Sequence, residues 1–206
     1  MIHRRRFALS LPVVLLAGCG EAPKEAVKKK EPEKPPEPVS GRYAFHQMFA
    51  ASRGWAPDVQ GLQILSIRLP DVKSEGGKFG AWQAMFGSLN KAKMKTFTYS
   101  VIEAGGNLHK GVFSSLEEPF SGTRGQAKPF VAAALRIDTD EAYQVAMKKA
   151  ADYVKKNPNI PVNFLAELTP RFPNLTWRVM WGESVSTSGY SIFVDASTGE
   201  YLATVR

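Results

Sequence analysis

The chain has 206 residues, a formal net charge of +8 and a single cysteine. This length suffices for one medium-sized domain or two small ones. One cysteine excludes an intramolecular disulfide and a cysteine-based metal site. Three of the basic residues, Arg4, Arg5 and Arg6, stand at the very start, so removal of a leader would lower the charge from +8 to +5. Such a mild charge, with no basic helix or aromatic-basic motif, argues against nucleic-acid binding.

Residues 1–18 have the pattern of an export signal. His3 to Arg6 precede an apolar run from Phe7 to Leu16, which is roughly half of the ~20 residues that a membrane-spanning helix needs. A basic start and a short apolar run are typical of a secretory signal. The run ends in Leu15-Leu16-Ala17-Gly18-Cys19, which resembles the lipobox of a bacterial lipoprotein signal. The resemblance implies cleavage before Cys19, a diacylglyceryl thioether on its sulfur, and acylation of the new amino group, with palmitate as the expected chain.

The alternative is that Cys19 is an incidental small residue near an ordinary cleavage site. If Cys19 is lipidated, each buried methylene contributes roughly 0.8 kcal/mol, so two or more acyl chains hold the protein on a membrane. We therefore expect a lipid-anchored protein of the bacterial cell envelope. Gly20 follows the cysteine. The absence of Asp at this position resembles the signal that sorts lipoproteins of Gram-negative bacteria to the outer membrane, facing the periplasm. Arg4-Arg5-Arg6-Phe7 also weakly resembles a twin-arginine signal, so the export route stays open.

Residues 19–40 are expected to be the lipidated cysteine followed by a disordered tether. Glu-Lys clusters and the proline-rich run Pro32–Pro38 offer no apolar face to bury. Prolines favour an extended chain of ~3.1 Å per residue, so twenty residues would reach up to about 60 Å from the lipid.

Residues 41–125 are predicted to form the first of two similar α+β units. Ser40 is a candidate cap for a helix from Gly41 to about Arg53, with Ala44, Phe45, Met48 and Phe49 on its apolar face. Strands are predicted at 62–69, 81–86 and 96–102. Lys91, Lys93 and Lys95 form either a basic stripe or the solvated end of a hairpin.

Residues 126–206 are predicted to form the second unit. Asp138 and Glu141 have capping-box spacing, and the helix they start is expected to end at Lys155 to Pro158. Its buried stripe is expected to be Ala142, Val145, Ala146, Ala150 and Tyr153. Strands are predicted at 162–168, 176–181, 190–194 and 201–205. The linking segment 126–137, apolar from Pro129 to Leu135, fits either a strand or a covered crossover.

The two halves correspond in sequence. Ala81–Gly87, with Trp82, parallels Thr176–Gly182, with Trp177, and both tryptophans are expected to pack against the helix of their own half. Glu103–Gly106 and Asp195–Gly199 parallel each other as tight turns between strands. The predicted fold class is α+β, with two repeats of one helix packed on an antiparallel sheet. Whether the repeats share one sheet stays open.

The segments Trp177–Trp181 and Tyr190–Leu202, with Val194-Asp195-Ala196-Ser197-Thr198-Gly199-Glu200 at the turn, are similar to PepSY-type domains. The similarity covers about residues 138–206, and the first half resembles the family more weakly. It implies a tandem, degenerate PepSY repeat. It also implies an inhibitory or chaperone-like binding role, as proposed for that family, with no shared catalytic residue. Asp195 is expected to organise its own turn.

Catalytic, metal-binding and cofactor-binding residues are not expected in the mature chain. Only His46 and His109 remain after processing, and neither has a second histidine at helical spacing. Glu117 and Glu118 form an adjacent carboxylate pair that fits a solvated loop. The aromatic residues are a better functional hint. Most of them must belong to the core, but some could line an exposed groove for a peptide or apolar ligand. An exposed strand edge could instead add a peptide strand.

These features predict a non-enzymatic binding or interaction module, anchored to the membrane by lipid, with a protein or peptide partner. The alternatives are an enzyme or enzyme subunit with a site between the repeats, and an accessory component of an envelope assembly. Convergence of His46, His109 and a carboxylate in a polar pocket would favour an enzyme, whereas a dry groove or free edge would favour binding.

Lipidation gives the first prediction. Cys19→Ser should accumulate as an unprocessed precursor without a diacylglyceryl group, because the sulfur is the acceptor of that group. Metabolic labelling with a radioactive fatty acid, followed by fractionation of the envelope, checks this. Normal processing and membrane retention of the variant, with no label on the wild-type chain, would contradict the prediction.

Overall fold

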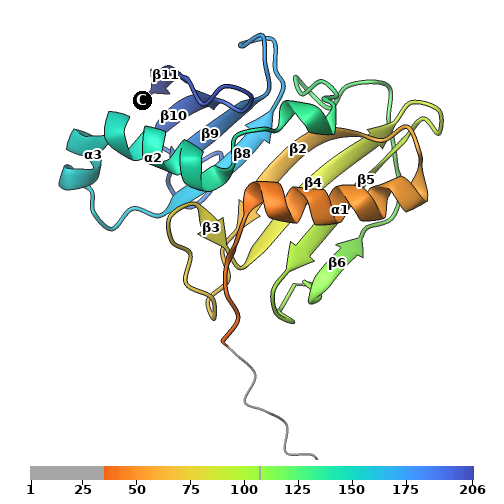
Figure 1. The fold of residues 1–206 in the computed structure, drawn as a ribbon, viewed down its shortest axis with the longest axis horizontal. Helices are drawn as coiled ribbons and strands as arrows, with labels where there is room; N and C mark the ends of the chain where they lie inside the picture. The colour runs from red at the N-terminus through yellow and green to blue at the C-terminus, as the bar shows by residue number, and fades with distance from the viewer. Residues whose placement is uncertain (1–34, 107) are drawn as a thin grey trace, which may run out of the picture. The chain divides into compact units, whose positions relative to one another are not determined.

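A computed structural model describes residues 35–106 and 108–206. In this part of the chain, nine strands form one antiparallel sheet, while β1 and β3 pair separately. Helices α1, α2 and α3 lie on one face of the sheet (Figure 1). The helices are α1 (Gly41–Trp55), α2 (Thr139–Lys149) and α3 (Ala151–Lys156). The strands are β1 (Val39–Ser40), β2 (Gln60–Ile67), β3 (Lys78–Phe79), β4 (Ala81–Ser88), β5 (Lys93–Ser100), β6 (Gly111–Ser114), β7 (Glu118–Pro119), β8 (Val162–Glu167), β9 (Thr176–Trp181), β10 (Tyr190–Asp195) and β11 (Tyr201–Val205).

The strands follow the order β11-β10-β9-β8-β2-β4-β5-β6 across the sheet, with β7 beside β5. Strands of the second half therefore lie on one side and strands of the first half on the other. The two groups join where β2 pairs with β8 through Ile64–Ala166 and Leu65–Leu165. The architecture confirms the α+β class, and both halves contribute to one sheet.

Strands β9 and β11 have the bounds that the sequence predicts, and the other predicted strands differ from the observed ones by one to three residues at one or both ends. The short strands β1, β3, β6 and β7 were not predicted. Strand β5 begins at Lys93 instead of Thr96. Lys93 and Lys95 are therefore part of the strand and half-buried, while Lys91 is exposed in the preceding turn. The three lysines thus lie at the end of the β4–β5 hairpin, where only Lys91 is fully solvated.

Helix α1 begins where predicted, because Ser40 Oγ accepts the N–H of Tyr43 at 3.4 Å. Its buried residues include Phe45 and Met48, which lie on the face toward the sheet. The Phe45 ring centroid lies 5.4 Å from that of Phe86 on β4. The helix extends to Trp55 and ends at Ala56, which is extended and precedes Pro57.

The second predicted helix is broken into two. The capping box of Asp138 and Glu141 forms as expected and starts α2. At Ala150 the backbone leaves the helical region, with φ −99° and ψ 12°, and α3 follows. Beyond the break, the Tyr153 ring stacks on Tyr190 of β10 with a centroid distance of 4.0 Å. This stacking orients α3 separately from α2.

The folded part begins earlier than the predicted tether boundary at residue 40. Val39 and Ser40 form β1, which pairs with Lys78 and Phe79 of β3. Phe79 is buried, and Val39 packs against the same core. The apolar contact of Val39 therefore draws the last two tether residues into the fold. Cys19 and the export signal lie outside the described residues.

The linking segment 126–137 is a crossover. Phe130 exchanges two backbone hydrogen bonds with Gly61, of 2.8 and 2.9 Å, and Lys128 N–H donates to the Leu168 carbonyl at 2.8 Å. A short 3-10 turn follows at Ala132–Ala134. The Phe130 ring is buried beside Phe45.

The N-termini of α1 and α2 meet at shared caps. Ser40 Oγ donates to Asp138 Oδ2 at 2.6 Å, and the Arg42 N–H donates to Asp138 Oδ1 at 2.9 Å. The Gly41 N–H donates to Thr139 Oγ1 at 2.9 Å. Since Thr139 N–H also donates to Asp138 Oδ1 at 2.7 Å, this carboxylate accepts from the first turn of both helices.

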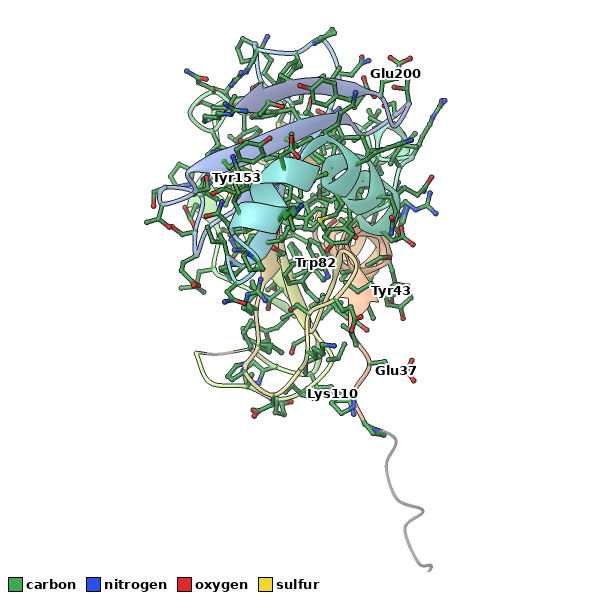
Figure 2. The ribbon with its side chains drawn as sticks, turned by 90° about the vertical axis from the view of Figure 1, so that its left-hand side faces the viewer. Glu37, Tyr43, Trp82, Lys110, Tyr153 and Glu200 are labelled. Atoms are coloured by element: carbon green, nitrogen blue, oxygen red, sulfur yellow. The ribbon has the colours of Figure 1, made fainter. Side chains whose placement is uncertain are left out.

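Trp82 and Trp177 lie directly behind the shared caps, and both are fully buried, as predicted. Figure 2 shows Trp82 inside the body of the molecule. The ring centroids are 6.5 Å apart, edge to face. Trp82 Nε1 donates to the Val39 carbonyl at 3.0 Å. Trp177 Nε1 donates to the Ile137 carbonyl at 2.9 Å. A Cβ on Gly41 would lie 3.0 Å from each ring, so glycine permits this close approach.

Trp82→Ala and Trp177→Ala should each lower the free energy of unfolding by about 3–5 kcal/mol, through lost burial and the cavity left behind. Each change also removes a buried hydrogen bond to the segment that starts a helix. Chemical denaturation and melting temperature check this. Phe113→Ala, at a ring that is 48% exposed, is the matched control and should have a far smaller effect. A change within about 0.5 kcal/mol for either tryptophan would contradict the core assignment.

Asp195 organises its own turn, as predicted. Its Oδ1 accepts the N–H groups of Ser197 at 2.7 Å and Thr198 at 2.9 Å. Its Oδ2 accepts from Asn174 Nδ2 at 2.8 Å. Burial alone would raise the pKa of Asp195, but these hydrogen bonds to the ionised form outweigh burial and lower its pKa below the ordinary value of 3.8.

Asp195→Ala should destabilise the protein by about 1–3 kcal/mol at neutral pH, because buried donors lose their acceptor. The folded-state pKa is depressed, so this stability is present above the unfolded-state pKa and is lost as pH falls through the folded-state pKa. Unfolding curves should therefore show the difference between variant and wild type shrinking below about pH 4. Exposed Asp71→Ala is the control. A difference independent of pH would contradict the assignment.

Candidate functional site

The face of the sheet opposite the helices carries the candidate site. Side chains alternate between the two faces of a strand. Trp82, Ala84 and Phe86 pack in the core with α1, so Gln83 and Met85 of the same strand point to the opposite face. Within the described residues, the helices cover only the first of these faces (Figure 1).

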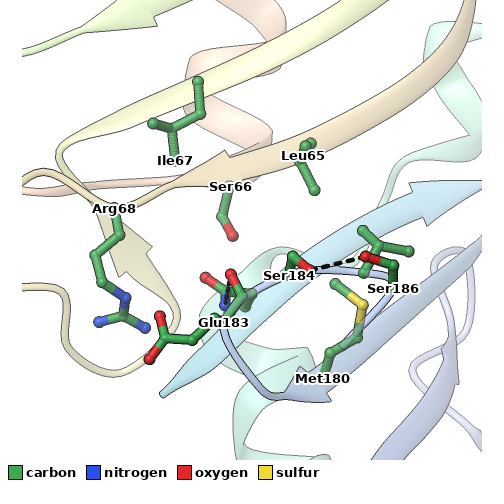
Figure 3. A pocket seen from close by; sticks show the side chains of 10 residues that line it. Leu65, Ser66, Ile67, Arg68, Met180, Glu183, Ser184 and Ser186 are labelled. Carbon is green, nitrogen blue, oxygen red and sulfur yellow. Dashed lines mark hydrogen bonds between the residues drawn. The ribbon is translucent and has the colours of Figure 1, made fainter. Parts of the chain in front are cut away.

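A groove of about 550 Å³ lies on this open face where β2 meets β8 and β9. Its accessible apolar lining comes from Leu65 and Ile67 of β2 and Val185 of the β9–β10 loop, and Met180 of β9 lies buried beneath them. Figure 3 shows Arg68 and Glu183 on the same rim, with Ser184 and Ser186 on the loop beside Met180. The groove thus combines an apolar floor with a polar rim, which is a common composition for a binding site.

The groove exists because β2 and β8 separate after a ladder of only two residue pairs. Beyond this ladder, the Phe164 N–H donates to the side-chain oxygen of Ser66 at 2.9 Å. The Arg68 guanidinium donates to the Val162 carbonyl at 2.8 Å. Side chains therefore occupy positions where backbone groups would pair in a continuous sheet.

The β9–β10 loop forms the far wall of the groove and is held in place by hydrogen bonds. Asn163 Nδ2 donates to the Gly182 carbonyl at 2.6 Å, which fixes the start of the loop to β8. Ser184 Oγ lies 2.9 Å from Thr187 Oγ1 and 3.1 Å from Ser186 Oγ. Gly182 has φ +151°, and a Cβ there would lie 2.7 Å from the Ser188 backbone, so a larger residue would not fit.

A second hollow of about 380 Å³ adjoins the groove through Ile67, which lines both. Its other walls include Gln83 and Thr98 of the sheet and Leu108 and Phe113 of the segment after β5. The Thr98 hydroxyl is buried and has no hydrogen-bond partner among the described residues. The open face is therefore hollowed on both sides of Ile67.

The two histidines do not line the groove. His46 is exposed on α1, on the helical side of the sheet. His109 lies between β5 and β6, where Nδ1 is 3.2 Å from Glu103 Oε2 and the ring lies 4.7 Å from the Phe113 ring. Among the described residues, no group of three His, Cys, Asp or Glu side chains is placed to hold a metal ion.

Of the four tryptophans, Trp82, Trp177 and Trp181 are buried, and Trp55 is half-buried at the end of α1. Trp55 Nε1 donates to Glu117 Oε1 at 2.7 Å. This hydrogen bond, with the nearby lysine charges, lowers the pKa of Glu117. The ammonium groups of Lys91 and Lys95 lie 5.9 and 5.7 Å from the Trp55 ring centre. Three of the four tryptophans are therefore core residues, and none of the four lines the groove.

The groove residues Leu65, Ile67 and Met180 were not singled out by sequence reasoning. Each is an apolar residue in a strand, and the sequence pattern alone does not distinguish it from a core residue. The only available signal was the alternation of each strand, which places Met180 opposite Val179 and Trp181. That signal cannot show that β2 and β9 border the same hollow.

No family model matches the chain, and no curated protein matches it significantly. A solved structure that does match is a crystal structure of a candidate lipoprotein from Clostridium difficile 630, with 11% sequence identity and a TM-score of 0.46. The match covers 78% of this chain and 91% of that chain. This TM-score is too low to establish a common fold. Within residues 35–106 and 108–206, no helix is long and apolar enough to cross a membrane.

Proposed function

We propose that this protein is an exported, lipid-anchored binding protein of the bacterial envelope that receives a peptide segment of a partner protein on the open face of its sheet. The observation that carries the proposal is the groove over β2, β8 and β9. Its volume of about 550 Å³ falls in the range of ligand pockets, and its floor of Leu65, Ile67 and Met180 is apolar. An apolar side chain of the partner would lose its contact with water there.

The titratable lining residues of the groove are Arg68 and Glu183, both exposed on the rim. These two residues do not form an acid-base pair around a reacting centre, and neither His46 nor His109 lines the groove. This arrangement supports a binding module over the rival function, an enzyme with a site between the two halves. In keeping with the PepSY resemblance, the bound partner would be a protease under inhibition or a client held in a chaperone-like manner.

We infer that the two halves are duplicated PepSY-like modules. In each half, a capped helix precedes four strands that lie in chain order across the sheet. In each half, the tryptophan of the second of these strands donates its indole N–H to the carbonyl before the helix cap. The ladder between the halves includes the pair Leu65–Leu165, and these two residues occupy corresponding positions in β2 and β8, because each lies opposite the residue that follows the tryptophan of the neighbouring strand. These shared details support duplication better than a chance similarity of topology.

The proposed anchor is Cys19, carrying diacylglyceryl and acyl chains. Val39 is the first residue of β1, so the intervening segment of about twenty residues would reach up to about 60 Å if extended. In a Gram-negative cell, the outer membrane facing the periplasm is the expected location. The tether would then let the open face meet partners away from the lipid surface.

A peptide-display selection tests the groove. The full mature chain, purified in detergent, is used to select random displayed peptides, alongside Ile67→Arg, Val185→Arg and the control Gln47→Arg on the exposed side of α1. Wild type and control should enrich peptides with a large apolar residue about tenfold more than either groove variant, as expected for about 1.4 kcal/mol of lost binding. Melting temperatures verify that the groove variants remain folded. Equal enrichment by all four proteins, or none by wild type, would contradict the groove as the binding site.

A further inference from the structure

The β2–β8 ladder has two ends, at both of which the strands separate. The ladder consists of two residue pairs, Ile64–Ala166 and Leu65–Leu165. We call the end beside Gly61 and Leu168 the closed end, and the end beside Arg68 and Val162 the open end. Because β2 and β8 are antiparallel, the closed end lies at the start of β2 and the end of β8, and the open end lies at the end of β2 and the start of β8.

At the closed end, the chain fills the gap with its own backbone. Residues Lys128–Phe130 reach both strands: Lys128 donates to the Leu168 carbonyl, and Phe130 exchanges two hydrogen bonds with Gly61. The segment packs tightly against β2, because a Cβ on Gly61 would lie only 2.4 Å from the Phe130 ring. A short extended peptide is therefore the natural filler for a gap of this kind.

At the open end, no described backbone segment bridges the two strands, and side chains take its place. Ser66 Oγ accepts the Phe164 N–H, and Arg68 donates to the Val162 carbonyl. Arg68 is exposed, and its guanidinium carbon lies 5.7 Å from the Phe79 ring centre. These groups satisfy the backbone of β8 without a neighbouring strand.

Hollows lie on both sides of the open end, and Arg68 lines both. The groove of about 550 Å³ opens on the free face of the sheet. A smaller hollow of about 120 Å³ lies beside Phe79, Val162 and Phe164, on the side of the helices. Consecutive side chains of an extended peptide point in opposite directions, so a peptide between β2 and β8 would place them alternately in these two hollows.

The geometry points to insertion of an extended partner peptide into the open end, as the counterpart of Lys128–Phe130 at the closed end. The peptide hydrogen-bonds to the Val162 carbonyl in the place of Arg68, whose side chain moves aside, while Ser66 keeps its buried hydrogen bond to Phe164. A large apolar residue enters the groove, and its small neighbours face the smaller hollow. This inference rests on the proposed binding function and specifies its mode, which is pairing of backbones between two strands instead of side-chain contact alone.

Disulfide tethering tests the insertion even where free affinity is low. Ser184→Cys places a thiol on the exposed groove wall of the full mature chain, and the probe is a capped peptide with a terminal cysteine and a central Ala-Phe-Ala. In a fixed redox buffer, the fraction of captured protein should fall about tenfold or more when the central residue is Ser, because apolar burial is lost. The chain without Ser184→Cys is the control for reaction at other sites.

Two further measurements separate insertion from groove binding. N-methylation of a peptide bond beside the central Phe should lower capture about three- to tenfold, as expected for one lost backbone hydrogen bond, while methylation near the tethering cysteine should not. Arg68→Ala should raise capture, because no side chain then has to be displaced from Val162, and Arg53→Ala on α1 should leave it unchanged. Melting temperatures verify that all variants are folded.

The outcomes are distinct. Capture that depends on the central Phe, falls on central N-methylation and rises with Arg68→Ala supports insertion. Capture that depends on Phe but not on N-methylation overturns insertion and leaves groove binding intact. Capture that is indifferent to the central residue overturns both.

Discussion

The carboxylate of Asp138 joins the N-termini of α1 and α2, and the rest of the architecture depends on this joint. It accepts N–H groups from Arg42 and Thr139 and the hydroxyl of Ser40, so one charge serves the positive ends of two helix dipoles. Trp82 and Trp177 pack edge to face behind it and tie each helix start to the sheet. Helix orientation, sheet pairing and the approach of the two halves are thereby fixed at one place.

The two halves are joined at their helix starts, and within the sheet only a short ladder between β2 and β8 joins them. Strands β2 and β8 pair only at Ile64–Ala166 and Leu65–Leu165. The separation of the strands requires that both ends be filled by something other than direct pairing. At one end the chain supplies its own segment, Lys128–Phe130, and at the other it supplies the side chains of Ser66 and Arg68. The candidate binding groove is a direct consequence of this asymmetry.

The groove and the helices lie on opposite faces of the sheet. The folded part starts with β1, which pairs with β3, and the helices occupy one face of the sheet. The groove opens on the other face, where Ile67 joins it to the second hollow. A large area of the sheet is thus accessible to a partner without movement of the helices.

Local sequence determined the elements whose stability comes from near neighbours. Ser40 and Asp138 mark the helix starts, because a cap needs only the N–H groups of the following turn. Asp195 marks its turn for the same reason, since Ser197 and Thr198 lie within reach along the chain. The alternating strands around Trp82 and Trp177 follow from a periodicity of two, and both rings are buried as that pattern predicts.

Tertiary structure alone decided the features that join distant residues. The pairing of Leu65 with Leu165, the sharing of Asp138 by both helices and the entry of Val39 into β1 depend on partners far along the chain. The break at Ala150 was likewise hidden, because the sequence there reads as one continuous helix. The groove was beyond sequence reasoning for the same physical reason. Leu65, Ile67 and Met180 line one hollow only because two strands of different halves separate beside them, and no local pattern encodes that separation.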